Sequence, residues 1–265
     1  MMRVFIEGVG LLGPGLSSWH ASCPLLIGSD HYTYAPTVVT ASDLLPPAER
    51  RRTGIPVKLA LAVGHEAIAH AGRDTATMPT VFTSSGGDGD NVHHICEALA
   101  APEREVSPTR FHNSVHNVAA GYWSIAARSQ EPSTSLCGYD ASFAAGLLEA
   151  VTEVIVDNRA VTLIAYDQPY PEPLHAKRNV GANFGVALVL TPEATKRTFA
   201  SLEVSYVADK NTPTDMADPG LEALRESIPA ARSLPLLSAL AHGATETIIV
   251  EYLHDSHLHI VVTPC

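Results

Sequence analysis

The stretch that decides the fold runs from Pro108 to Ala150. Its first part reads P-T-R-F-H-N-S-V-H-N-V-A-A-G-Y-W from residue 108, and its second part reads E-P-S-T-S-L-C-G-Y-D-A-S-F-A-A-G-L-L-E-A from residue 131. The spacing of apolar residues predicts a helix over 115–127, a strand over 133–136 and a helix over 142–156. A helix, a strand and a helix in direct succession are typical of an α/β fold.

The same alternation continues on both sides of this stretch. We predict a buried strand at Val4–Glu7 that ends in a glycine-rich turn from Gly8, a helix at Lys58–Ala71, a strand at Thr80–Thr83, a helix that ends near Leu99, and a strand at Val161–Ala165. Such alternation implies a mainly parallel mixed sheet with helices on both faces.

After Gly181 the pattern changes to short apolar runs, which predict antiparallel strands at the edge of the same sheet. These runs are 185–190, 201–207, 247–252 and 258–262, with one clear helix near 221–227. We therefore expect a single domain over 1–265, with a recognisable core at about 3–195 and a strand extension at about 196–265.

Composition excludes several classes of protein. The chain has 265 residues, 46% of them hydrophobic, and a net charge of −11, so a nucleic-acid partner is not expected. The one basic run, Arg50–Arg52, is interpreted as flanking a solvated helix. The four cysteines lack metal or disulfide spacing, which favours a reducing, cytoplasmic location. No apolar stretch is long enough to span a membrane, and no export signal is evident.

The stretch 108–150 is similar to the β-ketoacyl synthases of the thiolase superfamily. There an Asn-x-x-Ala-Gly helix precedes a G-P-S-x-S-x-A-T-A-C strand and turn, whose cysteine opens a long buried helix. Asn117, Ala120 and Gly121 match the first motif, and Pro132, Ser133 and Ser135 match the second. This resemblance implies a thiolase-like half over about residues 3–195 and places Asp140 where the family has its cysteine.

An aspartate at this position is a poor acceptor for an acyl group, because the resulting anhydride hydrolyses readily. Asp140 is also a standard helix N-cap, and we interpret it as one. Cys137 lies three residues upstream and is interpreted as a buried structural cysteine, because sliding the alignment to it breaks the match at Pro132 and Ser135. In the family, two catalytic histidines come from a second, similar half of the protein. About 70 residues remain here after the first half, which is too few for such a second half. The segment around His242 nevertheless resembles one of the histidine motifs.

The resemblance extends to chain-length factors, ketosynthase-like subunits without the cysteine, and in particular to the short forms of aryl polyene and xanthomonadin-type clusters. It implies a non-catalytic subunit of an acyltransferase-type family that forms a heterodimer with a full-length β-ketoacyl synthase and works on chains carried by acyl carrier protein. A homodimer of the isolated chain is a further possibility, and no cofactor or metal is implied. Candidates for interface or tunnel walls are Asn117, Tyr122, Trp123 and Phe143, each of which could instead be core.

Two alternatives stay open. One is a decarboxylase or thioesterase acting on carrier-bound acyl groups, with the Gly138 or Ala141 amide as oxyanion donor and His112 or His116 as a weak catalytic candidate. The other is a metal-dependent hydrolase, suggested by thirteen histidines. Its candidate ligands are His112 with His116, His93 with His94, and the group Glu251, His254, Asp255, His257 and His259.

Overall fold

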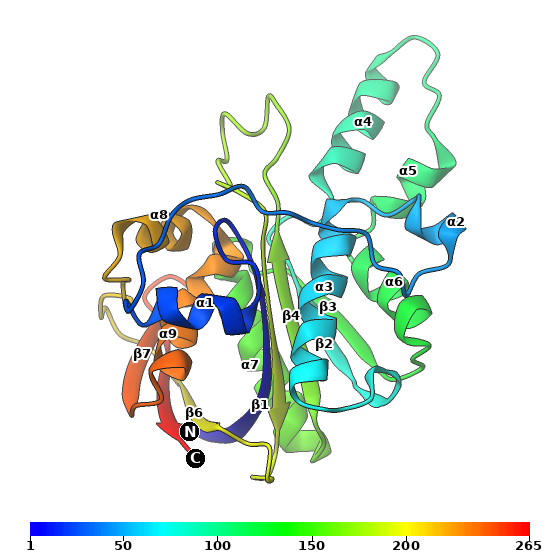
Figure 1. Ribbon diagram of the computed structural model, residues 1–265. Helices are drawn as coiled ribbons and strands as arrows, with labels where there is room; N and C mark the ends of the chain where they lie inside the picture. The colour runs from blue at the N-terminus through cyan, green and yellow to red at the C-terminus, as the bar shows by residue number, and fades with distance from the viewer.

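A computed structural model describes residues 1–265 and contains one sheet of eight strands with helices on both faces (Figure 1). The strand order is β3-β2-β4-β5-β1-β6-β8-β7. The strands are β1 (Met2–Leu12), β2 (Thr80–Thr83), β3 (Ser133–Leu136), β4 (Val161–Asp167), β5 (Phe184–Thr191), β6 (Ala200–Val207), β7 (Glu246–Glu251) and β8 (His257–Pro264).

The α-helices are α1 (Trp19–Leu26), α2 (Pro47–Arg50), α3 (Ile55–His70), α4 (Gly89–Ala100), α5 (Pro108–Asn113), α6 (Val118–Ala127), α7 (Ser142–Asp157), α8 (Pro219–Ser227) and α9 (Leu234–His242). Three short 3₁₀ helices are η1 (Thr75–Thr77), η2 (Tyr139–Ala141) and η3 (Pro229–Ser233).

The structure confirms the α/β class and the strand extension, but the expectation of a mainly parallel sheet is wrong for the strand pairings. Only β2 pairs in parallel, with β3 and with β4, whereas the other five pairings are antiparallel. The reason is that the chain turns back after β4, so β5 lies between β4 and β1 and runs against both. The C-terminal strands then extend the sheet beyond β1.

The predicted end of the first strand is also corrected. Strand β1 continues through Gly8 and Gly10 to Leu12 and does not turn at Gly8. A Cβ atom would lie 2.1 Å from the Ala67 carbonyl oxygen at Gly8 and 2.0 Å from the Val63 carbonyl oxygen at Gly10. Both glycines therefore serve to bring the backbone of α3 close to the sheet.

The sequence patterns did not predict several of the helices. Helix α1 has Pro24 in its interior, and α9 begins Leu234-Pro235-Leu236-Leu237 and buries nearly its whole circumference. A helix that is apolar on all sides shows no periodicity, so the expectation of one helix after Gly181 was wrong. The helix predicted over 115–127 begins only at Val118, and a separate short helix, α5, precedes it and ends at Asn113.

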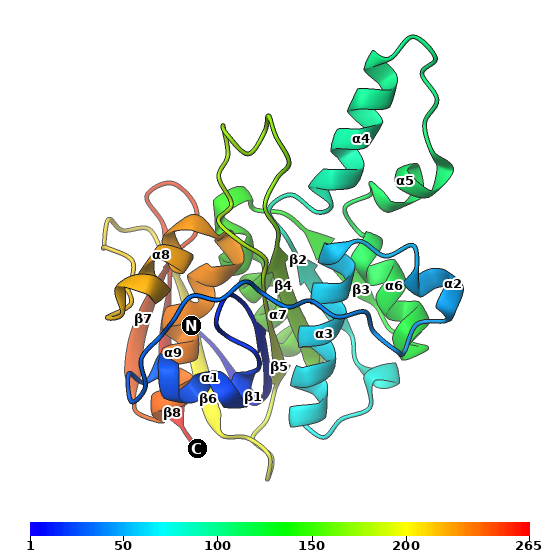
Figure 2. The ribbon, with the colours of Figure 1, turned by 45° about the horizontal axis from the view of Figure 1, so that its top comes forward.

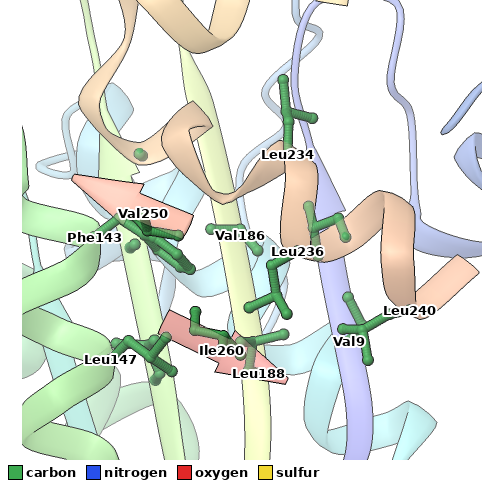
Figure 3. Packing of buried hydrophobic residues seen from close by; sticks show 14 of the residues in the cluster. Val9, Phe143, Leu147, Val186, Leu188, Leu234, Leu236, Leu240, Val250 and Ile260 are labelled. Carbon is green, nitrogen blue, oxygen red and sulfur yellow. The ribbon is translucent and has the colours of Figure 1, made fainter. Parts of the chain in front are cut away.

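The core has two parts, one on each face of the sheet. On one face α1, α7, α8 and α9 cover the sheet, and on the other α3 and α6 cover it. Figure 3 shows the first part, where α7, α9, β5 and β8 meet. Each fully buried Leu, Val, Ile or Phe there stabilises the fold by roughly 1.5–3 kcal/mol before entropic costs. The labelled residues include Phe143, Leu147, Val186, Leu188, Leu236 and Ile260.

Helix α4 and the loop to α5 project from this body (Figure 2). Within α4 only Gly89 and Asn91 are buried. None of the helices has both the length and the apolar character that crossing a membrane requires.

Asp167, at the end of β4, connects the sheet to the C-terminal extension. It is buried, and its carboxylate accepts hydrogen bonds from the Ser85 amide (2.8 Å), the Ser85 hydroxyl (2.7 Å) and the Ala230 amide (2.8 Å). Burial raises the pKa of Asp167 to about 6, although these hydrogen bonds act in the opposite direction.

We predict that Asp167→Asn lowers the free energy of unfolding by about 1–3 kcal/mol at pH 7, because the amide group of asparagine turns an N–H toward one of these donors. The folded pKa of Asp167 lies above the unfolded value of 3.8, so the folded state takes up the proton first and the wild type gains stability from this residue as the pH falls. The difference between the two proteins should grow by about 1 kcal/mol from pH 7 to pH 5 in urea titrations. A constant or shrinking difference would contradict this assignment.

Candidate functional site

The turn after β3 is the segment in which the sequence resemblance places the nucleophile. Strand β3 ends at Leu136, η2 follows, and α7 begins at Ser142. Tyr139 has a φ of +56°, a conformation that is unusual for a large side chain. The interpretation of Asp140 as a helix cap is wrong: the residue before α7 is Ala141, and no side chain caps that helix.

Asp140 binds two arginines instead. Its Oδ1 lies 2.8 Å from Arg178 Nη2, and its Oδ2 lies 3.7 Å from Arg232 Nη2. Burial alone would lower the pKa of Arg178, but hydrogen bonds to Asp140 and Tyr170 and the negative charge of Asp140 raise it above its ordinary value. The carboxylate is therefore held as one partner of a salt bridge and is not oriented as a nucleophile.

Cys137 and the two nearby histidines are not hydrogen-bonded to one another. Cys137 is exposed, which corrects the expectation of a buried cysteine, and its Sγ lies 3.4 Å from the Ser85 carbonyl oxygen. His116 Nε2 lies 3.1 Å from the Ser84 carbonyl oxygen. His112 is exposed on α5, with its ring 6.2 Å from that of Tyr122. Neither histidine hydrogen-bonds to Cys137 or Asp140.

The proposed oxyanion donors are already occupied. The Gly138 amide donates to the Ser142 hydroxyl at 3.0 Å, and the Ala141 amide donates to the Gly138 carbonyl at 2.9 Å. A developing oxyanion needs free donors that point at it. The turn therefore offers a decarboxylase or thioesterase no free amide at either position.

The histidine groups do not converge on a metal site either, since no three His, Cys, Asp or Glu side chains are arranged to hold an ion. His257 and His259 both bind Asp209, at 2.6 Å and 2.7 Å. His93 pairs with Glu97 on α4. His242, at the end of α9, lines a separate hollow with Glu246 and Ser238 that does not include Asp140.

The two edges of the sheet differ. At one end, residue Thr214 pairs with strand β7. The Ile249 amide donates to the Thr214 hydroxyl, and the Thr214 amide donates to the Ile249 carbonyl, both at 2.9 Å. At the other end β3 pairs with β2 alone, and its outer edge is open. An open edge presents unpaired backbone groups to another chain.

Helix α6 lies beside this open edge and exposes a row of small and polar side chains. Asn117, Gly121 and Ser124 are exposed and, with Ser133 and Ser135 of β3, line a hollow of about 560 Å³. We call this surface, together with the apolar hollow described next, the α6–β3 face.

The apolar hollow holds about 420 Å³ between α5 and α6. Its walls carry three exposed large hydrophobic residues, Phe111 (66% exposed), Val115 (48%) and Ile125 (44%). Asn117 and Tyr122 also border it, and the Tyr122 hydroxyl lies 3.2 Å from Asn113 Oδ1. A hydrophobic hollow beside an open strand edge is a surface on which a partner chain can bury apolar area.

The other two candidates for interface walls lie in the core. Trp123 packs on the second face of the sheet, with its ring 6.2 Å from that of Phe82. Phe143 is fully buried in the first part of the core (Figure 3). Tyr122 borders the apolar hollow and Trp123 does not, although both side chains are buried. The spacing of residues along α6 could not predict this difference.

Sequence reasoning missed a basic hollow of about 520 Å³ between α2, α3 and α5. Arg51, Arg52, Lys58 and Arg110 line it, and no carboxylate lies within 4.0 Å of Arg51, Lys58 or Arg110. Asp88 and Asp90 also border the hollow, and burial raises the pKa of the Asp88 carboxyl group. The basic run did flank a helix, as expected, but only the fold brings Arg110 beside it.

Comparison with known proteins identifies the family. Residues 28–252 match the family described as β-ketoacyl synthase, N-terminal domain. No curated protein gives a significant match.

Solved structures share the fold at low identity. One is the ketosynthase ApeO in complex with its chain length factor ApeC from Xenorhabdus doucetiae, with 22% identity, coverage of 98% of this chain and 100% of that chain, and a TM-score of 0.75. A second is the AntDE:AntF complex of a type II polyketide synthase, with 11% identity, coverage of 100% and 99%, and a TM-score of 0.71. A third is the ishigamide ketosynthase/chain length factor, with 15% identity, the same two coverages and a TM-score of 0.69.

The family match covers most of the chain and includes the strand, turn and helix around Asp140. The chain belongs to the β-ketoacyl synthase N-terminal domain family.

Proposed function

We propose that this chain is a non-catalytic, chain-length-factor-type subunit that pairs with an active β-ketoacyl synthase. The pair would extend carrier-bound chains in fatty acid, polyketide or aryl polyene synthesis. Complexes of a ketosynthase with a chain length factor have the same fold over nearly the full length of both chains, which supports this proposal. Asp140, held by two arginines where the family has its cysteine, supports the lack of activity in the isolated chain.

The α6–β3 face is the surface that we propose for pairing with the ketosynthase. Gly121 is the residue on this face that argues most directly for a closely approaching partner. Glycine inside a helix costs about 1 kcal/mol relative to alanine. Within this chain nothing lies within 4 Å of the Cβ that another residue would place at Gly121, so the fold does not need a glycine there. A partner backbone that approaches α6 closely would need one. We therefore assign this face to the ketosynthase.

The basic hollow suits the second partner, acyl carrier protein. The carrier's prosthetic arm is attached through a phosphodiester, which is an anion. On a chain of net charge −11, three cations without carboxylate partners provide a local attraction for such a group. Arg51, which directly follows α2, and Arg110, on α5, line the hollow and are our candidate contacts.

We predict that Gly121→Met abolishes co-purification with the partner β-ketoacyl synthase, because a long side chain would project into the interface. The isolated variant should be as stable as the wild type or more stable by about 1 kcal/mol. Co-expression followed by gel filtration measures the pairing, and thermal unfolding measures the stability.

The matched control is Val156→Met, which adds the same side chain at an exposed position of α7. It should leave the complex intact. Normal pairing by Gly121→Met would argue against the α6–β3 face as the interface.

We also predict that the double variant Arg51→Glu and Arg110→Glu weakens binding of carrier protein to the complex about tenfold, equivalent to roughly 1.4 kcal/mol. The wild-type affinity should fall as salt rises, and the variant should have lost most of that dependence. Titration calorimetry at two salt concentrations measures both effects. Lys196→Glu, an exposed cation outside the hollow, is the control, and equal weakening by this variant would refute a specific site.

A further inference from the structure

The segment between β6 and α8 makes a pair of histidine contacts that the proposed function does not use. We call its residues 208–214 the strap. His257 Nδ1 lies 2.6 Å from Asp209 Oδ1, and His259 Nε2 lies 2.7 Å from Asp209 Oδ2. The two histidines are two residues apart on β8, so their side chains point to the same face of the sheet. One carboxylate near the start of the strap therefore holds it to β8 at two points.

The strap crosses the face of the sheet opposite the first part of the core. Leu258 and Ile260 alternate with the two histidines along β8 and belong to that first part. The second part of the core, on the opposite face, contains no residue of β6, β7 or β8. Figure 2 shows the chain leaving β6 and passing around the outer side of β7 before it reaches α8.

The far end of the strap occupies the edge of β7. Thr214 exchanges two hydrogen bonds with the backbone of Ile249. In an antiparallel ladder every second residue directs its backbone groups away from the neighbouring strand, so Thr247 and Glu251 also present theirs at this edge. The strap therefore takes the central one of three outward-facing positions.

The edge of β7 is self-complementary once the strap leaves it. Two copies related by a twofold axis at Ile249 would place Ile249 opposite Ile249 and Thr247 opposite Glu251. The two isoleucines would exchange backbone hydrogen bonds and pack on each other, and neither glutamate would face another glutamate. Residues 247–250 are all β-branched, which favours a strand. A second copy of this chain is accordingly the partner that this edge fits.

We propose that the strap masks the edge of β7 against pairing with a second copy of this chain, and that Asp209 latches the strap through His257 and His259. An uncovered edge strand is a template for pairing with another chain. With β7 masked, β3 is the one open edge of the sheet. The proposal does not depend on the proposed function, because it concerns the opposite end of the sheet.

The charge of the latch depends on pH. Burial raises the pKa of Asp209, but hydrogen bonds from His257 and Asn211 and the charge of His259 outweigh it and hold this pKa below its usual value. The carboxylate therefore stays ionised over the range in which histidine side chains change charge. The attraction is strongest at the acidic end of that range, where imidazoles are positive, and weakens as the pH rises and they become neutral.

The other charged groups around the latch have partners of their own. The pairs are Lys210 with Asp255, His254 with Asp255, Glu251 with Arg232, and Glu203 with Arg3. None of them includes Asp209, His257 or His259. The pH dependence of the latch is therefore assigned to its own three groups.

Light scattering after gel filtration tests the mask through the mass of the isolated full chain. Asp209→Ala should raise the mass at least twofold over the wild type, increasingly so at higher protein concentration. The double change His257→Gln and His259→Gln removes the latch from the other side and should have the same effect. Adding Thr247→Pro should restore the wild-type mass, because proline removes an N–H at the outer edge and leaves the pairing with β8 intact.

The matched control is Asp43→Ala, which breaks an exposed pair of aspartate and arginine outside the strap. It should leave the mass unchanged.

Hydrogen exchange of the Ile249 amide measures the strap directly. It is followed by NMR in the Thr247→Pro background, where pairing is blocked, and is corrected for the intrinsic pH dependence of exchange. From about pH 5 to about pH 8 the protection of this amide should fall roughly tenfold, and the protection of the Val186 amide in the central strand β5 should not change. Asp209→Ala should show the low protection at both ends of the range.

Unchanged protection of Ile249 in Asp209→Ala, or protection independent of pH in the protein with an intact latch, would overturn the latch. A raised mass that persists with Thr247→Pro would place the contact elsewhere. Faster exchange without a rise in mass would rule out a second copy as the partner that the strap excludes. All of these measurements use the isolated chain, so their failure leaves the pairing with a ketosynthase untouched.

Discussion

The salt bridges of Asp140 with Arg178 and Arg232 are the interaction on which the site depends. They hold together the three segments that meet at the start of α7, and they engage the residue that the sequence resemblance aligns with the family's cysteine. A carboxylate flanked by two arginines is fixed in place by the two ion pairs. The same geometry that makes an arginine a good partner for a carboxylate therefore keeps Asp140 engaged in ion pairs.

The rest of the architecture is asymmetric in a way that fits a subunit of a larger assembly. One end of the sheet is covered by Thr214, whereas the other ends in the open strand β3 beside the exposed small residues of α6. The apolar hollow with Phe111 and Ile125 continues that open end. An edge strand and exposed hydrophobic side chains are unfavourable in an isolated protein, and a partner that covers both would remove the cost.

The sequence predicted the strands to within about two residues, except at β1, because runs of β-branched and apolar residues bounded by polar turns have few other solutions. It failed where the signal was not periodic. Helix α9 is apolar all round, and Gly8 and Gly10 of β1 resemble a turn although they serve close packing with α3.

For the site, motif spacing located Asp140 but not its partners. Arg178 and Arg232 lie 38 and 92 residues further along the chain, and only the fold brings them to that carboxylate. The basic hollow was missed for the same reason, since Arg51 and Arg110 meet only in three dimensions.

We propose that the chain is an obligatory but non-catalytic partner of a β-ketoacyl synthase. The most direct test is an elongation assay with carrier-bound substrate, in which the partner ketosynthase and this chain are supplied separately and together. We expect extended products only from the pair, with every covalent acyl group on the ketosynthase. Acylation of this chain followed by extension in the absence of the ketosynthase would contradict it.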